Sequence, residues 1–368
     1  MTPPNAAEPL VSFEDVHLGY GSTEVLRGIS FNVMPGETKI LLGESGAGKT
    51  SIMKLAAGLI RPDSGKIHVM DRDIIASTEV ELLDFRRNIG FVFQEGALFD
   101  AIDVRDNVAF RLNEENFPDE EVTARVKEAL EFVEMEHSID RFPAELSGGM
   151  RRRVSIARAL IGRPPMVFYD SPTAGLDPVT SQTIILLILR LRDLLGVTSL
   201  LATHRLQDAF GLSSYHFDNA SGGAVPNSSN GAPRIFLPSP GPEWGANSGP
   251  TIGNRPRPEI GERAGPTIGI RPGPEIGERA RPAIGIRPGP EIGVRGEPSL
   301  GNRPGPEIGI RSEIRTGAER QFAAPVTGVA AVTTLLLLRN GEIYFEGAPE
   351  KFLETNDPYL KQFLASAE

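Results

Sequence analysis

The chain carries the glycine-rich pattern G-x-x-x-x-G-K-[ST] at residues 43–50. An apolar run, Ile40–Leu42, precedes this pattern, and a helix-like stretch, Ser51–Leu59, follows it. Strand, glycine loop and helix in that order predict a loop whose backbone N–H groups surround a phosphate at the positive end of a helix. The residues expected to contact the nucleotide here are Gly43, Glu44, Ser45, Gly46, Ala47, Gly48, Lys49, Thr50 and Ser51.

Two side chains of this loop have distinct predicted roles. Lys49 is expected to reach the outer phosphates, and the Thr50 hydroxyl is expected to bind Mg²⁺. The alternative is a glycine-rich turn with a chance lysine, and the flanking strand and helix argue against it.

The amino-acid composition excludes some kinds of site and disfavours some kinds of partner. A length of 368 residues allows two domains, or one domain with an insertion. The absence of cysteine excludes disulfides and Cys-based metal sites, and the net charge of −10 does not favour nucleic acid as a partner. No run approaches the roughly 18 apolar residues that span a bilayer, and residues 1–9 show no signal-peptide pattern. Any contact with a membrane is therefore expected through a partner.

Three polar residues follow apolar strand-like runs. Gln94 follows Phe91–Phe93, Asp170 ends the run Met166–Asp170, and His204 follows Ser199–Thr203. Polar residues at strand ends face the ligand crevice in open α/β folds. Gln94 can touch Mg²⁺ or a water, Asp170 can hold a Mg²⁺-bound water, and His204 is a candidate sensor of the γ-phosphate. A structural histidine is the competing interpretation of His204.

A second anion site is predicted at Leu146–Met150. Ser147 is a plausible N-cap of the helix that follows, which we predict over Arg151–Ile161. Gly148 and Gly149 leave backbone N–H groups exposed at the positive end of that helix. The basic run that follows is otherwise typical of a solvated face.

An aromatic residue is a candidate for contact with the base. Tyr20 is predicted to lie in a polar loop before the phosphate loop, where it can stack on a nucleotide base. A half-buried turn tyrosine is an equally good interpretation from position alone.

The stretch Asp119–Glu136 predicts an amphipathic helix. Val122, Val126, Leu130 and Val133 recur on one face, and the charged residues lie opposite. We interpret these charges as a solvated helix face.

Taken together, these motifs resemble the ATP-binding cassette (ABC) family. The resemblance identifies residues 43–50 as Walker A, Gln94 as the Q-loop, 146–150 as the signature and 166–170 as Walker B. It identifies Ala174–Asp177 as the D-loop, His204 as the switch histidine and Tyr20 as the A-loop aromatic. It covers roughly residues 10–212 and 333–368.

The resemblance implies a fold, ligands and partners. The fold is α/β, with a P-loop NTPase core on a mixed sheet, an N-terminal antiparallel β subdomain and a helical subdomain. The ligands are ATP and Mg²⁺, the metal being held by Thr50, Gln94 and Asp170. The partners are an integral-membrane permease and a second copy of the chain, which forms a head-to-tail dimer. Each ATP then lies between one phosphate loop and the partner's segment 147–149. The location is the cytoplasmic face of the cell membrane, reached through the permease.

A narrower resemblance points to the ATPase of Mla/Mce-type lipid transporters. It rests on Phe93–Phe99, Val104–Val108, Met150 in the signature, and the ending Asp357–Leu364. It implies a phospholipid-like cargo and an MCE-type lipid-binding protein as a further partner.

One position departs from the ABC pattern. The family expects a glutamate directly after the Walker B aspartate as the base for the attacking water, and this chain has Ser171. A hydroxyl is a poor general base near neutral pH, so slow hydrolysis with intact MgATP binding is expected. Glu95 or Asp177 could supply a carboxylate. Two rival functions are a nucleotide-gated regulatory subunit with little turnover and a non-transport ABC protein.

Residues 249–312 repeat an octapeptide of the form x-Pro-x-Ile-Gly-x-Arg-x eight times. Dense proline and glycine oppose helix and central strand, and one isoleucine per unit cannot offset an ordering entropy of about 1–2 kcal/mol per residue. Disorder over 221–325 is therefore predicted, the alternatives being a regular β-coil or an Arg-rich tether for anionic lipid. The predicted organisation is an ATPase domain at 10–220 with its helical subdomain at about 95–165, this insertion at 221–325, and a C-terminal completion at 326–368. The completion contains a strand, Thr333–Leu338, its hairpin partner, Ile343–Glu346, and two terminal helices.

Overall fold

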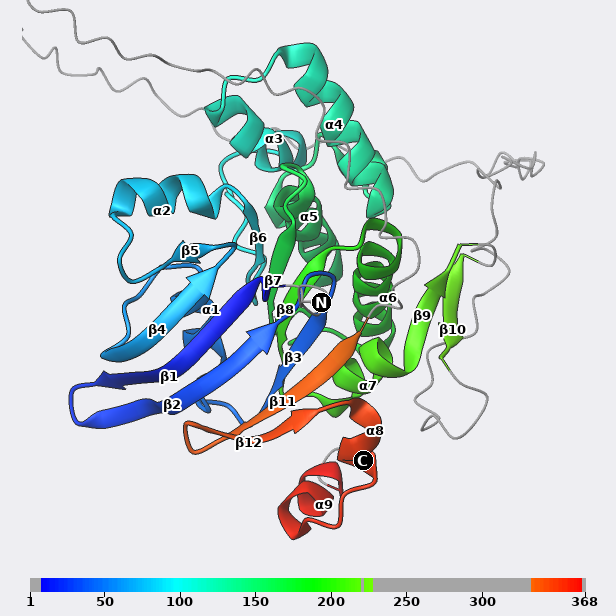
Figure 1. Cartoon of the computed structure of the whole chain (residues 1–368). Helices are drawn as coiled ribbons and strands as arrows, with labels where there is room; N and C mark the ends of the chain where they lie inside the picture. Colours follow the sequence, from blue (N-terminus) through cyan, green and yellow to red (C-terminus); the bar gives the residue numbers. More distant parts are fainter. Residues whose placement is uncertain (1–7, 220–221, 228–331, 366–368) are drawn as a thin grey trace, which may run out of the picture. The chain divides into compact units, whose positions relative to one another are not determined.

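The computed structural model describes residues 8–219, 222–227 and 332–365, and every structural statement below refers to these. The octapeptide repeat lies outside the described residues. A six-stranded sheet in the order β12-β11-β3-β8-β7-β6 forms the centre (Figure 1). Its strands are β3 (Thr38–Leu42), β6 (Ile89–Val92), β7 (Met166–Asp170), β8 (Thr198–Ala202), β11 (Thr333–Arg339) and β12 (Glu342–Gly347). All neighbours pair in parallel except β11 and β12.

The three central strands of this sheet are buried along their whole length. Every residue of β3, β7 and β8 is buried, which is the pattern of a parallel sheet covered on both faces. Successive side chains enter two different hydrophobic clusters: Ile40 and Leu42 belong to one, and Leu41 belongs to the other. The sheet therefore separates two cores, and its strand ends meet at one edge.

The first core lies between the central sheet and a group of helices. It contains apolar residues of α3 (Val104–Glu114), α4 (Asp119–Phe132), α5 (Gly148–Leu160), α6 (Pro178–Leu195) and α7 (Leu206–Ser214). The short 3₁₀ turns η1 (Glu136–Ser138) and η2 (Pro143–Glu145) connect α4 to α5. Figure 1 shows α3 and α4 projecting beyond the end of the sheet.

The second core lies under an antiparallel sheet in the order β2-β1-β4-β5. Its strands are β1 (Val11–Tyr20), β2 (Thr23–Val33), β4 (Ser64–Val69) and β5 (Arg72–Asp73). Phe13 and Phe31 stack with ring centroids 4.8 Å apart. The helices α1 (Lys49–Ala56) and α2 (Glu79–Arg86) contribute buried apolar residues to the same core.

The C-terminal segment completes the central sheet. β11 pairs in parallel with β3, with Leu337 opposite Leu42. The helices α8 (Pro349–Leu353) and α9 (Pro358–Ala365) follow β12. A separate hairpin, β9 (Tyr215–Asp218) with β10 (Gly223–Pro226), lies beside α6 in Figure 1. β10 falls inside the range 221–325 that the sequence assigned to the insertion, so the predicted onset of disorder at 221 is wrong.

Several predicted boundaries differ from the structure. The signature helix begins at Gly148 rather than Arg151, because Ser147 caps it and both glycines lie in its first turn. The predicted helix 119–136 ends at Phe132, since Glu134 has a left-handed backbone with φ 58°. Tyr20 is the last residue of β1 and not a loop residue. In the structure, Gln94 follows the end of β6 by two residues.

Candidate nucleotide-binding site

The loop 43–50 connects β3 to α1 and requires glycine at two positions. Gly43 has φ 146° and Gly48 has φ 99°, values that L side chains rarely adopt. A Cβ on Gly43 would lie 2.7 Å from the Leu338 carbonyl oxygen, and one on Gly48 would lie 2.5 Å from Leu26 Cδ2. Steric contacts and backbone dihedral angles therefore both require glycine at these two positions, where the loop follows a concave path.

The loop ends at an uncapped helix N-terminus. α1 begins at Lys49, and its N-cap, Gly48, has no side chain to bond the first turn. The N–H groups of a first helical turn have no acceptor inside the helix, and the helix dipole is positive there. This combination favours a phosphate group at the concave side of the loop.

The ammonium of Lys49 lies inside this loop. Lys49 Nζ donates to the carbonyl oxygens of Gly43 at 2.7 Å and Glu44 at 2.8 Å. Burial lowers the pKa of Lys49, while the charges of Asp170 and Glu44 act in the opposite direction. The two carbonyls are thus acceptors that a phosphate oxygen can replace.

Thr50 and Asp170 are brought together from distant parts of the chain. The Thr50 hydroxyl lies 3.0 Å from Asp170 Oδ2 and 3.2 Å from Oδ1. One hydroxyl and one carboxylate are hard oxygen donors of the kind that Mg²⁺ prefers beside phosphates. These two residues fit the metal predicted from the sequence.

The other strand-end residues share this edge of the sheet. β6, β7 and β8 are neighbouring parallel strands, with Val92 opposite Tyr169 and Asp170 opposite Ala202. Gln94 and His204 each follow their strand by two residues, and both are exposed. The sheet therefore places both side chains at the edge that carries Asp170.

Ser171 occupies the position directly after Asp170. It is half-buried, it has a left-handed backbone with φ 48°, and its N–H donates to the Ala202 carbonyl at 2.9 Å. Its hydroxyl lies 3.4 Å from Asp170 Oδ1, which is at the outer limit of a hydrogen bond. The hydroxyl is therefore only weakly engaged by its neighbour.

The two carboxylates considered as substitutes differ in their surroundings. Asp177 caps α6: it accepts from the Thr180 N–H at 3.0 Å and from the Thr180 hydroxyl. These hydrogen bonds lower the pKa of Asp177. Glu95 is exposed and follows Gln94. The carboxylate of Asp177 is thus used to cap α6. Within the described part of the chain, no hydrogen bond between Glu95 and Asp170 is recorded.

The signature segment forms the start of α5. Ser147 Oγ accepts from the Met150 N–H at 3.3 Å, and Ser147 and Gly148 are exposed. A Cβ on Gly149 would lie 2.2 Å from Thr180 Cγ2, so glycine permits the close packing of α5 on α6. Nothing recorded within the described residues joins Ser147 to loop 43–50. The pairing of the two anion sites across a second copy of the chain stays a prediction.

Tyr20 lies at the tip of the β1–β2 hairpin, opposite Thr23. Its side chain is 57% exposed. An exposed ring at a strand tip is free to stack on a base, and its role remains a prediction.

Two arginines of α5 hold the segment that contains Gln94, and sequence analysis missed them. The Arg152 guanidinium donates to the Phe93 carbonyl, and Arg158 donates to the carbonyls of Ala97 at 2.8 Å and Gly96 at 3.1 Å. Burial lowers the pKa of Arg152, and Asp170 and Glu95 partly offset this. The triple-arginine run was visible in the sequence, but nothing in it distinguished the buried Arg152.

A buried carboxylate supports the segment around His204, and it was also missed. Asp208 Oδ2 accepts from the hydroxyls of Thr173 and Thr203. Burial raises the pKa of Asp208, and these hydrogen bonds and the Arg205 charge act against that rise. Asp208 therefore links the segment after β7 to the segment after β8.

Replacing Arg152 by methionine is expected to destabilise the segment at Gln94. The Phe93 carbonyl would lose its charged donor, which costs about 1–3 kcal/mol of unfolding free energy. Urea unfolding would measure the loss, and faster amide exchange at residues 93–97 would locate it. Arg87→Met is the matched control, because Arg87 is 58% exposed. Equal stability of both variants would contradict the assigned role.

Comparisons with known proteins agree with this geometry. The family model described as "ABC transporter" matches residues 26–174. The methionine import ATP-binding protein MetN of Brucella abortus is 39% identical over 204 residues, which is 55% of each chain. The sulfate/thiosulfate import ATP-binding protein CysA of Thermosynechococcus vestitus is 37% identical over 199 residues, covering 54% of this chain and 58% of that protein. The chain thus spans about half the length of the curated relatives it matches.

Two solved structures share the fold over most of their own length. The cassette MJ0796, in a dimeric post-hydrolysis state bound to ADP and Pi, matches with a TM-score of 0.51 and 30% identity over 55% of this chain and 90% of its own. The structure of cbiO1 from Clostridium perfringens, part of the ABC transporter complex cbiONQ, matches with a TM-score of 0.53 and 31% identity over 57% of this chain and 84% of its own. These matches and the geometry of the loop confirm the predicted fold class. The chain belongs to the ATP-binding subunits of the ABC transporter family.

Proposed function

We propose that this chain binds MgATP and hydrolyses it as the energy-coupling subunit of an ABC transporter. The observation that carries the proposal is the meeting of Thr50 and Asp170 at 3.0 Å beside the buried ammonium of Lys49. A metal-binding hydroxyl, a metal-binding carboxylate and a phosphate-binding cation at one helix N-terminus are the parts that phosphoryl transfer requires.

Each residue of the nucleotide site has its own role in this proposal. Lys49 exchanges its two carbonyl acceptors for outer phosphate oxygens, and Thr50 and Asp170 hold the Mg²⁺ that neutralises the developing charge. Gln94 and His204 contact the γ-phosphate region from the neighbouring strand ends. Ser147 and Gly149 of a second copy close the site in a head-to-tail dimer. Dimeric cassettes occur among the structural matches, as the cassette MJ0796 shows.

The proposal is tested by nucleotide binding and turnover in the assembled complex. We expect purified chain to bind ATP in the presence of Mg²⁺, and we expect turnover that is slow because Ser171 replaces a carboxylate. Binding without any turnover in the complex would favour a nucleotide-gated regulatory subunit instead. A complete lack of affinity for MgATP would overturn both functions.

A surface beside Gln94 supports a permease as the partner. Phe93, Phe99, Phe110 and Phe142 are each between 37% and 46% exposed. The rings of Phe99 and Phe110 lie 4.7 Å apart, so they form one apolar contact area. No helix in the described part of the chain is long and apolar enough to cross a bilayer. We propose that the chain docks through this surface on the cytoplasmic face of a membrane.

Aspartate at Phe99 or Phe110 is expected to weaken recovery of the permease. A charge in the buried core of an interface costs several kcal/mol, so co-purification from membranes should fall at least about tenfold. The matched control is Val80→Asp, since Val80 on α2 is 77% exposed and lies outside this surface. ATP binding should be unchanged in all three variants. Full recovery of the permease with the Phe99 and Phe110 variants would refute this docking surface.

For the cargo, we propose a phospholipid-like molecule handed over with an MCE-type lipid-binding protein. The support is the resemblance of Phe93–Phe99, Val104–Val108 and the ending 357–364 to Mla/Mce-type ATPases. The matched relatives are named as import proteins for methionine and for sulfate/thiosulfate, which favours a small polar solute as the alternative. Lipid analysis of the purified complex, alongside uptake of labelled methionine and sulfate, separates the two. Uptake of either solute without bound lipid would eliminate the lipid proposal.

A further inference from the structure

A cavity of about 220 Å³ lies between two helices and the β9–β10 hairpin. Its walls come from α5, from α6, from the residues after α4 and from the residues beside the hairpin turn. The polar side chains in its lining are Glu134, Arg153, Thr183, Arg190 and Asn219. None of these residues belongs to the nucleotide site.

Arg190 presents a charge that no carboxylate neutralises. Its guanidinium lies over the Phe132 ring at 4.4 Å and near the Phe217 ring at 5.8 Å. Nη1 donates to the Phe132 carbonyl at 3.3 Å, while Nε is buried without a hydrogen-bond partner. Within the described part of the chain, no ion pair to Arg190 is recorded. Two rings therefore fix the orientation of a cation whose hydrogen-bonding capacity is incompletely used.

Arg153 adds a second cation to the same cavity. It is half-buried on α5, and the structure records no ion pair to it among residues 8–219, 222–227 and 332–365. Glu134 is the one carboxylate among the described residues that line the cavity. Two guanidinium groups and one carboxylate leave a net charge of +1, which matches a monoanion.

The remaining walls of the cavity are apolar. Val133, Leu186, Leu187 and Phe217 line it beside the charged groups. An inorganic ion would leave these walls without a contact partner, whereas a short hydrocarbon chain would cover them. The volume of about 220 Å³ admits a small organic molecule with a short hydrocarbon chain.

Carboxylate chemistry fits this cavity better than phosphate chemistry. A phosphate monoester carries a charge of about −1.5 to −2 at neutral pH, and Glu134 opposes the second charge. A carboxylate carries one charge and can accept two parallel hydrogen bonds from a guanidinium. Arg153 and Arg190 supply the guanidinium donors that a carboxylate requires, and Leu186, Leu187 and Phe217 supply an apolar wall for a hydrocarbon.

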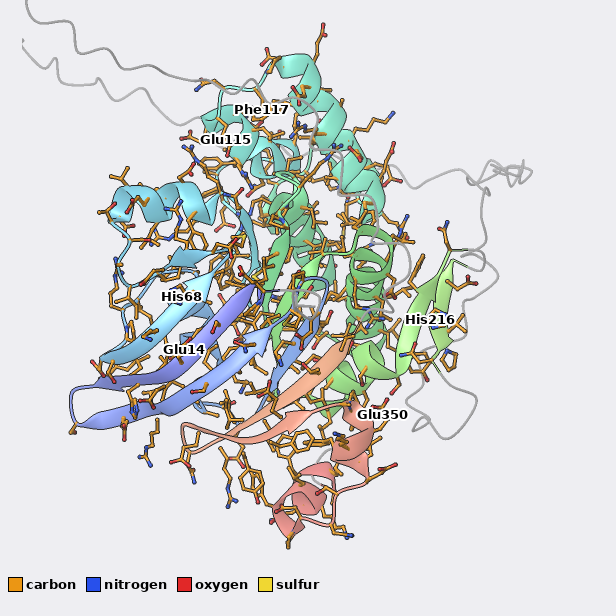
Figure 2. All side chains as sticks on the ribbon, viewed as in Figure 1. Glu14, His68, Glu115, Phe117, His216 and Glu350 are labelled. Atoms are coloured by element: carbon orange, nitrogen blue, oxygen red, sulfur yellow. The ribbon has the colours of Figure 1, made fainter. Side chains whose placement is uncertain are left out.

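We propose that this cavity binds a small aliphatic carboxylate, which links the β9–β10 hairpin to the signature helix. The hairpin is held at its base by Asn227, which donates to the Ser213 carbonyl at 2.8 Å and lies 3.0 Å from His216 Nδ1. Figure 2 shows His216 on β9 at the hairpin. Phe217, Asn219 and Gly222 of the hairpin region line the cavity. Ligand binding is therefore expected to stabilise the hairpin.

The test is direct binding to the full chain without nucleotide, measured by calorimetry. Three probes are used: hexanoate, leucine and inorganic phosphate. We expect hexanoate to bind and to slow amide exchange in the hairpin at residues 215–219 and 222–225. If leucine also binds, the site accepts an ammonium group beside the carboxylate. If leucine does not bind, the site is restricted to simple carboxylates. Both results support the proposal, whereas binding of phosphate alone overturns it.

Three variants locate the site. Arg153→Gln is expected to weaken hexanoate binding at least about tenfold, since a charge-assisted hydrogen bond is lost. Leu186→Phe is expected to abolish binding by filling the apolar end. Lys127→Gln, on exposed α4 surface outside the cavity, removes an equal charge and should leave binding unchanged. No binding of hexanoate, or affinity unaltered in both cavity variants, overturns the proposal. Because the assay contains no nucleotide, its outcome is independent of MgATP binding.

Discussion

Ser171→Glu is expected to raise ATP turnover of the assembled complex by about 10²-fold or more. A glutamate at this position supplies the general base that the serine hydroxyl cannot provide near neutral pH, and such a base typically contributes about 10²–10⁴ in rate. Ser171 is half-buried, and its hydroxyl lies 3.4 Å from Asp170 Oδ1, at the outer limit of a hydrogen bond, so its replacement breaks no strong contact. Ser171 is itself a non-glycine residue with a left-handed backbone, φ 48°, so glutamate at this position requires no new backbone conformation. Steady-state phosphate release, with nucleotide saturating, measures the gain.

The neutral variant Ser171→Gln is the matched control for this gain. Glutamine has almost the size of glutamate and lacks the basic carboxylate, so its turnover should stay near that of the unchanged chain. Nucleotide affinity should be similar in all three proteins, because Lys49, Thr50 and Asp170 are untouched. If glutamate and serine give equal rates, another group activates the water. In that case Glu95 becomes the next residue to test.

Lys49→Ala is expected to lower the affinity for ATP at least about tenfold. The ammonium that now lies at 2.7–2.8 Å from two loop carbonyls would no longer be available to the phosphates, and one charge-assisted hydrogen bond contributes about 1.5–3 kcal/mol. Lys54→Ala is the control, since Lys54 is an exposed lysine on the same helix. Fluorescent-nucleotide titration measures both affinities. Equal affinities would show that the backbone of the loop binds the phosphates without Lys49.

The pH dependence of binding provides a second readout for Lys49. Burial lowers the pKa of Lys49, and the protonated form is the one that attracts phosphate. As the pH rises through this lowered pKa, the charge is lost earlier than for an ordinary lysine. The affinity of the unchanged chain should therefore fall on the alkaline side. The affinity of Lys49→Ala should not show this fall.

The nucleotide-binding edge was predictable because it depends on local patterns. Buried parallel strands are continuous apolar runs in the sequence, so β3, β7 and β8 were located within two residues, and the polar residues at their ends followed directly. The backbone path of the phosphate loop depends on its glycines, and these glycines are part of a short sequence pattern. The apolar face predicted for α4 is also confirmed, since Val122, Val126 and Leu130 are buried.

Features that depend on long-range packing could not be predicted. Arg152 reaches the Phe93 carbonyl, which is 59 positions away in the chain, and Asp208 accepts from Thr173, which is 35 positions away. The cavity joins Arg153 on α5 with Arg190 on α6. Helix ends were the other source of error, because the left-handed Glu134 that stops α4 has no strong signal in the sequence. The charge of an arginine and its spacing in the sequence do not show whether its side chain is buried or exposed.

The order of the strands has a consequence for synthesis on the ribosome. β3, which leads into the phosphate loop, has β8 on one side and β11 on the other, and residues 203–332 separate these two neighbours in the chain. During translation one edge of β3 therefore stays without its partner until the codons for β11 have been read. An open, apolar strand edge is a template for wrong pairing. The time spent translating the intervening stretch is thus an interval in which this edge of the nascent chain is open to wrong pairing.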